Sequence, residues 1–211
     1  MARPPKFTRK QVQLAALQIV DDQGLPALSM RSLARALDTG AMTLYGYVAL
    51  REDLDVLLVD AVMSEIEISA SKSWQGDVRT IARNVWQALH AHPGVIPLIL
   101  TRRSRAPSAL RVAEALLNAL ARSGRRKLDL LFAFRAVTSL IMGMAQNDLA
   151  GPLAVRPGDS KKATISRILA LPATQYPHLL AIARVTARSS AQAEFDAALD
   201  LLLAGLARWR G

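Results

Sequence analysis

The chain has 211 residues, of which 51% are hydrophobic and 5% aromatic, and its formal net charge is +10 at pH 7. This composition supplies enough apolar side chains for one large domain, or for a small domain followed by a medium one, and it excludes an intrinsically disordered chain. The sequence contains no cysteine. Disulfides, thiolate metal sites and cysteine nucleophiles are therefore excluded, and a reducing compartment is consistent with this composition.

The N-terminal segment, MARPPKFTRK, is basic, but the apolar stretch of a signal peptide does not follow it. By inspection, no apolar run of the sequence reaches the roughly 18 residues needed to cross a bilayer. We therefore expect the protein to act in the cytoplasm.

The positive charge predicts a polyanionic partner, such as nucleic acid or anionic lipid. Residues 1–51 hold seven basic and three acidic side chains, whereas residues 101–127 hold eight basic and one acidic. Because the densest positive segment lies in the middle of the chain, net charge alone does not identify the binding surface.

Apolar residues recur at helical spacing along the chain, and long alternating patterns of β-branched and aromatic residues are absent. This periodicity predicts an all-α protein. Thr8 and Ser29 are expected N-caps and Gly24 is an expected C-cap. The first four helices are predicted over residues 8–22, 29–37, 41–47 and 51–72.

A break at Trp74-Gln75-Gly76 is expected to separate these helices from the rest of the chain. Prolines then punctuate a series of further helical segments, and residues 150–164 form the longest predicted loop. The later helices are predicted over residues 77–91, 95–103, 107–123, 127–149, 160–170, 177–188 and 190–209.

The first three predicted helices, with a tight break at residues 38–40, indicate a helix-turn-helix motif, in which the third helix enters the major groove of DNA. Leu44 and Val48 are expected to hold its inner face. Tyrosine and threonine hydroxyls on the outer face can reach phosphates and base edges, and apolar atoms can meet thymine methyl groups. The residues left for this outer face are Ala41, Met42, Thr43, Tyr45, Gly46 and Tyr47.

The segment from Phe7 to Val62 resembles the DNA-binding domain of the TetR family of bacterial repressors, through ALSMRSLARAL, MTLYGYV and REDLDVLL. The rest of the chain is similar, more loosely, to the helical C-terminal domains of the tetracycline repressor branch. The resemblance implies a DNA-binding domain over residues 1–52, which continues into a linking helix over 51–72. It also implies an effector-binding and dimerisation domain over 53–211.

The function implied by the resemblance is that of a ligand-responsive repressor in the bacterial cytoplasm, associated with the nucleoid. It would act as a homodimer on a palindromic double-stranded operator. It would need no cofactor, and its small effector would be apolar or amphipathic.

The resemblance also assigns residues to the DNA contact. One departure from the family pattern is Asp38, which stands in the turn where glycine is usual; aspartate tolerates the left-handed conformation better than most residues. Alternatively, the two tyrosines are half-buried aromatics, and the arginines, Arg35 among them, are solvated surface charges. The assigned residues are Lys6, Arg9, Lys10, Ser29, Arg31, Ala41, Met42, Thr43, Tyr45, Tyr47 and Arg51.

Further residues are candidates for the effector pocket and the dimer interface, with ordinary core packing as the alternative. The basic cluster of Arg102, Arg103 and Arg105 is interpreted as a solvated loop and helix end. The pocket candidates are Trp86, Leu89, Ile99, Leu116, Met142, Gln146 and Asn147, and the interface candidates are Leu131, Arg135, Phe195, Leu199, Leu202 and Leu206.

No metal site is expected, because His90 and His92 are two residues apart and would face different sides of a helix. Glu65 and Glu67 occupy the region of the fourth helix where the tetracycline repressor has a metal-chelating histidine. Tetracycline is therefore disfavoured as the effector.

Two other classes of protein remain open at this point. An enzyme is disfavoured, because the sequence shows no HExxH motif, phosphate-binding glycine loop or carboxylate–histidine set. A basic helical protein that binds nucleic acid or membranes without sequence preference would share the same charge.

Overall fold

The computed structural model describes residues 6–48, 50–150 and 161–209, and within these ranges all regular secondary structure is helical. The predicted all-α class is confirmed. Three short 3-10 turns, η1 (Leu25–Ala27), η2 (Pro93–Val95) and η3 (Arg103–Arg105), join some of the helices. The helices are α1 (Arg9–Gln23), α2 (Met30–Ala36), α3 (Ala41–Leu44), α4 (Arg51–Ser64), α5 (Trp74–Ala91), α6 (Ile96–Arg102), α7 (Pro107–Ala121), α8 (Lys127–Ala150), α9 (Lys161–Leu169), α10 (Pro177–Thr186) and α11 (Ala191–Arg208).

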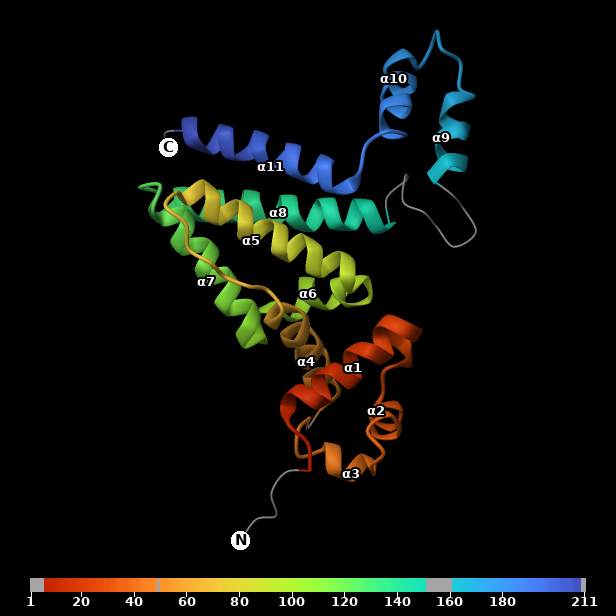
Figure 1. The fold of residues 1–211 in the computed structure, drawn as a ribbon, viewed down its shortest axis with the longest axis vertical. Helices are drawn as coiled ribbons and strands as arrows, with labels where there is room; N and C mark the ends of the chain where they lie inside the picture. The colour runs from red at the N-terminus through yellow and green to blue at the C-terminus, as the bar shows by residue number, and fades with distance from the viewer. Residues whose placement is uncertain (1–5, 49, 151–160, 210–211) are drawn as a thin grey trace.

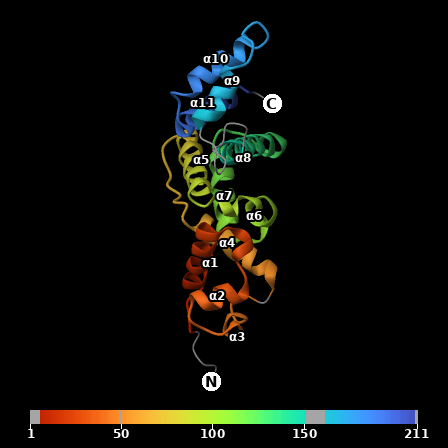
Figure 2. The same cartoon turned by 90° about the vertical axis from the view of Figure 1, so that its right-hand side faces the viewer.

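The molecule is elongated, with α1, α2 and α3 at one end and α9 and α10 at the other (Figures 1 and 2). Between them, α5, α7, α8 and α11 pack on one another, and α4 joins this body to the N-terminal helices. One cluster of buried apolar side chains runs without a break from Val12 in α1 to Leu206 in α11. The N-terminal helices are therefore packed against the body through a shared core.

Local sequence signals explain how the first helices begin and end. The Thr8 hydroxyl accepts the Gln11 N–H at 3.2 Å, and Ser29 caps α2 in the same way through Ser32. Asp38 has φ = 47°, so the turn does use the left-handed conformation expected for this position.

The fourth helix was predicted to reach residue 72, and this is wrong. It ends at Ser64, and α5 begins at Trp74, inside the expected break. Ser73 accounts for the new start, because its hydroxyl accepts the Gly76 N–H at 3.0 Å and caps the helix. Glu65 consequently caps α4, and Glu67 lies beyond the helix.

Helix α8 is long and apolar enough over Lys127–Asp148 to cross a membrane by length and composition. It contacts α5, α7 and α11. The α8 side chains that pack on these helices account for part of its apolar composition. Other apolar side chains of α8, among them Leu128 and Phe132, are exposed to solvent.

The buried carboxylate of Asp60 joins three helices. Its two oxygens accept the side-chain N–H of Gln13 in α1 at 3.0 Å and the backbone N–H of Ser108 in α7 at 2.8 Å. Both Asp60 and Gln13 are buried. Since a buried donor without an acceptor costs free energy, this carboxylate ties the N-terminal helices to the body.

Replacing Asp60 with Ala should lower the free energy of unfolding by about 1–3 kcal/mol, because the Ser108 N–H and the Gln13 side-chain N–H lose their acceptor. Urea unfolding followed by circular dichroism measures this loss. Asp22→Ala, at an exposed position of α1, is the matched control and should change stability little. Equal unfolding curves for the two variants would contradict the proposed role of Asp60.

Candidate nucleic-acid interface and internal cavity

The α3 segment carries one buried and one exposed face, as predicted. Leu44 and Val48 are fully buried. On the other side, Met42 is 81% exposed and Tyr45 is 50% exposed, and Thr43 is exposed beside them. Since large apolar and aromatic side chains are costly to leave in water, this exposed face is a candidate for contact with a partner.

Tyr47 does not share the outer face, contrary to expectation. Its hydroxyl donates to the Phe7 carbonyl at 2.6 Å and accepts the Phe7 N–H at 2.8 Å. The two rings lie 6.5 Å apart. Tyr47 therefore holds the chain that precedes α1 against the end of α3, and the half-buried alternative describes it better.

The N-terminal segment also contacts the turn between α2 and α3. Lys6 donates from Nζ to the Asp38 carbonyl at 3.1 Å and to the Thr39 hydroxyl at 3.4 Å. Arg9 and Lys10 are exposed on the first turn of α1. Positive charge is thus held beside the exposed face of α3.

The other predicted DNA-contact residues lie on the same three-helix unit. Arg31 is exposed on the first turn of α2, Ser29 is occupied as its cap, and Ala41 is only partly exposed. The side chain of Arg51 lies outside the described residues.

The mid-chain basic cluster lies at the end of α6, and Arg103 and Arg105 are exposed to solvent, as interpreted from the sequence, but Arg102 and Arg105 also contact acidic residues of α4. Arg102 lies 3.5 Å from the Asp55 carboxylate, and Arg105 lies 3.1 Å from Glu52 and 3.6 Å from Asp53. These contacts join α6 and η3 to the first turns of α4.

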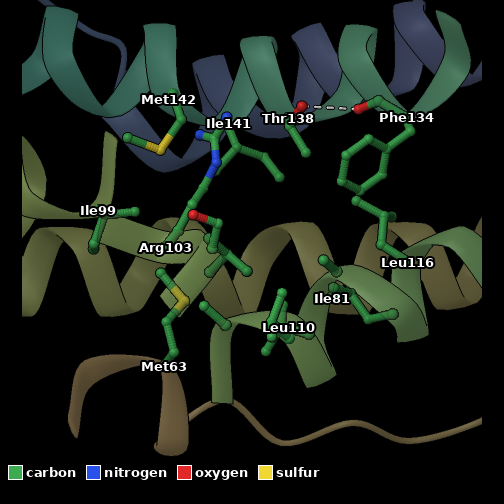
Figure 3. A pocket seen from close by; sticks show the side chains of 15 residues that line it. Met63, Ile81, Ile99, Arg103, Leu110, Leu116, Phe134, Thr138, Ile141 and Met142 are labelled. Carbon is green, nitrogen blue, oxygen red and sulfur yellow. Dashed lines mark hydrogen bonds between the residues drawn. The ribbon is translucent and has the colours of Figure 1, made fainter. Parts of the chain in front are cut away.

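A cavity of about 210 Å³, open to solvent on one side, lies between α4, α5, α6, η3, α7 and α8, and its wall is mostly apolar (Figure 3). Met63 reaches it from the last turn of α4. Its lining consists of Met63, Ile81, Val85, Ile99, Arg103, Ser104, Ala109, Leu110, Val112, Ala113, Leu116, Phe134, Thr138, Ile141 and Met142.

Three of the predicted pocket residues, Ile99, Leu116 and Met142, line this cavity. The other four do not. Trp86 is buried against Phe195 with its ring centroid 5.1 Å away, and Leu89 is core. Gln146 and Asn147, chosen for their polarity, are exposed. Arg103 was missed, because nothing in a run of three nearby arginines shows which one borders the cavity.

Two histidines at the end of α5 make separate polar contacts. His90 lies 3.2 Å from Asp148, and burial of this carboxyl raises its pKa, although the neighbouring His90 opposes the rise. His92 lies with Nδ1 2.8 Å from Asp21 and Nε2 3.2 Å from Glu65. These contacts link α1, the end of α4 and the residue after α5.

These carboxylates flank the His92 ring on opposite sides and do not form a chelate. Within residues 6–48, 50–150 and 161–209, no group of three histidine or acidic side chains is arranged to hold a metal ion.

The predicted interface residues fall into two groups. Leu131 and Arg135 are exposed on α8, and Leu202 is partly exposed on α11. Phe195, Leu199 and Leu206 are buried within the chain, where α11 packs on α8. The periodicity of α11 did not distinguish the face turned to α8 from the outer one. Other apolar residues are also exposed on α8, on α11 and just after it: Leu128, Phe132, Leu201 and Trp209.

Comparison with known proteins adds to this geometry. The family model described as the tetracyclin repressor-like C-terminal domain matches residues 69–209. An HTH-type transcriptional regulator of Saccharopolyspora erythraea is 33% identical over 141 residues, which cover 66% of this chain and 60% of that protein. The HTH-type transcriptional repressor DrrR1 of Streptomyces coeruleorubidus is 31% identical over 148 residues, which cover 69% of this chain and 55% of DrrR1.

The matched part of the chain therefore spans less than two thirds of the length of either relative. Among solved structures, ActR of Streptomyces coelicolor in complex with actinorhodin has a TM-score of 0.78 and 26% sequence identity, with 96% of this chain and 99% of ActR covered. The fold, the exposed face of α3 and the matched family agree, and the chain belongs to the tetracycline repressor-like (TetR) family of transcriptional regulators.

Proposed function

We propose that the protein is a ligand-responsive repressor that binds a palindromic DNA operator as a homodimer in the bacterial cytoplasm. The observation that carries this proposal is the exposed face of α3, where Met42, Thr43 and Tyr45 project from a helix anchored by buried Leu44. Lys6, Arg9 and Lys10 would supply phosphate contacts, which give affinity, while the α3 side chains read base edges.

Dimer formation is supported by the outer faces of α8 and α11. Both helices belong to the body of the chain, yet Leu128 and Phe132 in α8 and Leu201 in α11 remain more than half exposed. Packing these faces against a second copy would bury them in a four-helix bundle. A two-fold axis would also bring two α3 helices to successive major grooves.

The α9–α10 segment offers a second surface for a partner subunit. These two helices pack on each other and stand apart from the body (Figure 1). Leu179, Ile182 and Val185 are exposed on α10. Such an apolar arm fits contact with the other protomer better than contact with water.

The cavity is the proposed effector site. ActR is solved with actinorhodin bound, and the cavity here has the concave apolar wall that a small-molecule site requires. Because Met63 belongs to α4 and lines the cavity, an occupant would touch the helix that follows the DNA-binding unit. A coupling of about 1–3 kcal/mol between the two sites would suffice for regulation.

Selection from random duplex DNA tests the repressor function. We expect the full chain to enrich a palindromic sequence and to bind it about 10³-fold or more tightly than unselected duplex. Gel shifts at two salt concentrations make the measurement. Sequence-independent binding with a steep salt dependence would instead identify a non-specific nucleic-acid-binding protein.

Tyr45→Ala should weaken operator binding by about 1–3 kcal/mol, because an exposed base- or phosphate-contacting side chain is lost. Its thermal unfolding should stay nearly unchanged, since half of the residue is exposed. Fluorescence anisotropy and thermal melting measure the two quantities. Tyr47→Phe is the contrasting variant, because it removes the two hydrogen bonds that hold the Phe7 backbone. It should lower the thermal stability as well as the operator affinity. A large stability loss in Tyr45→Ala would identify Tyr45 as core.

Asp38→Gly should raise operator affinity severalfold by removing a negative charge beside DNA. Glycine adopts the left-handed conformation readily, so the free energy of unfolding should change by no more than about 1 kcal/mol. Asp38→Ala removes the same charge but should lose about 1 kcal/mol of stability in this conformation. If affinity rises in neither variant while both fold, the Asp38 charge does not lie near the operator.

A further inference from the structure

Arg103 is the cationic side chain of the cavity wall. Figure 3 shows its nitrogen atoms reaching across the cavity toward Ile141 on α8. Within the described part of the chain, its guanidinium makes no ion pair or hydrogen bond, in contrast with Arg102 and Arg105 on either side. The hydroxyl of Thr138 is already engaged, because it donates to the Phe134 carbonyl at 2.9 Å.

Arg103 is exposed to solvent at the edge of an apolar cavity. A guanidinium in this position gains from a partner that accepts its N–H groups and carries opposite charge. We propose that the effector is a small, largely apolar acid whose carboxylate pairs with Arg103. This inference rests on the proposed function of the cavity as effector site. Since Arg103 is exposed, the carboxylate would lie at the mouth of the cavity and the apolar body inside.

The volume limits the size of the apolar body. About 210 Å³ is below the roughly 300–1,000 Å³ of typical drug-sized sites. A fused two-ring aromatic acid fits this limit without rearrangement of the wall, and a larger ligand would have to move one of the surrounding helices.

Arg103 also lies next to the arginines that contact α4, so binding of a ligand at Arg103 can change those contacts. It follows Arg102, which faces Asp55 at 3.5 Å, and it lies two residues before Arg105, which pairs with Glu52 and Asp53. Drawing Arg103 toward a carboxylate moves η3, and with it the two flanking arginines. The Asp55 carboxylate is the least exposed of the acidic partners, whereas the Arg105–Glu52 contact is the one with hydrogen-bond geometry.

The binding test uses 2-naphthoate and its uncharged analogue 2-naphthamide, measured with the full-length chain by isothermal titration calorimetry. We expect 2-naphthoate to bind about tenfold more tightly than the amide, as a charge-assisted hydrogen bond allows. Arg103→Met should abolish this preference, and Arg103→Lys should retain part of it. Arg126→Gln, at an exposed residue just before α8, is the matched control for lost charge and should behave as the unmodified chain.

The coupling test uses the double variant Arg102→Gln/Arg105→Gln. It should bind 2-naphthoate as tightly as the unmodified chain. Saturating 2-naphthoate should weaken operator binding about tenfold in the unmodified chain, within the usual range of allosteric coupling, and less than about twofold in the double variant. An equal effect in both would overturn the assignment of these arginines as the link.

Failure of the inference is distinguishable from failure of the proposed function. If both compounds bind equally, or if Arg103→Met keeps the preference for naphthoate, the acidic effector is overturned while a regulated repressor stands. Binding of neither compound also overturns the acidic two-ring effector. The operator selection described above judges DNA recognition independently of either compound.

Discussion

The Asp60 carboxylate is the contact on which the arrangement of the two ends of the molecule depends. It lies in the middle of α4 and satisfies one donor from α1 and one from the start of α7. Apolar contacts have no preferred direction, whereas a buried carboxylate with two directional partners permits few relative positions. The orientation of α1 to α3 relative to the cavity is therefore specified through α4.

The remaining polar contacts of α4 are more exposed and act at its two ends. Arg102 and Arg105 face acids in its first turns, and His92 bridges Glu65, at its end, to Asp21 in α1. Exposed ion pairs are each worth about 0–1 kcal/mol. Helix α4 is therefore held by a buried carboxylate at its middle and by weaker ion pairs at its two ends. This arrangement suits a helix that pivots, because a ligand can replace the ion pairs without breaking the buried Asp60 contacts.

Local features of the fold could be predicted from sequence, and features that depend on distant partners could not. The caps at Thr8 and Ser29 and the left-handed Asp38 follow from residues within a few positions. The inward turn of Tyr47 depends on Phe7, 40 residues away, and the pairing of Arg105 depends on Glu52, 53 residues away. Ile99, Leu116 and Met142 could be predicted as cavity residues because apolar periodicity indicates the inner face of a helix. Arg103 could not, because a charged residue does not contribute to that pattern.

The arginine contacts to α4 also act as built-in counterions. Glu52, Asp53 and Asp55 stand at the start of the helix that follows the proposed recognition helix, where three unneutralised carboxylates would repel a phosphate backbone. Arg102 and Arg105 screen them. Withdrawal of these arginines would therefore expel DNA by charge repulsion, in addition to any change in spacing between two half-sites, and this expulsion would be strongest at low ionic strength.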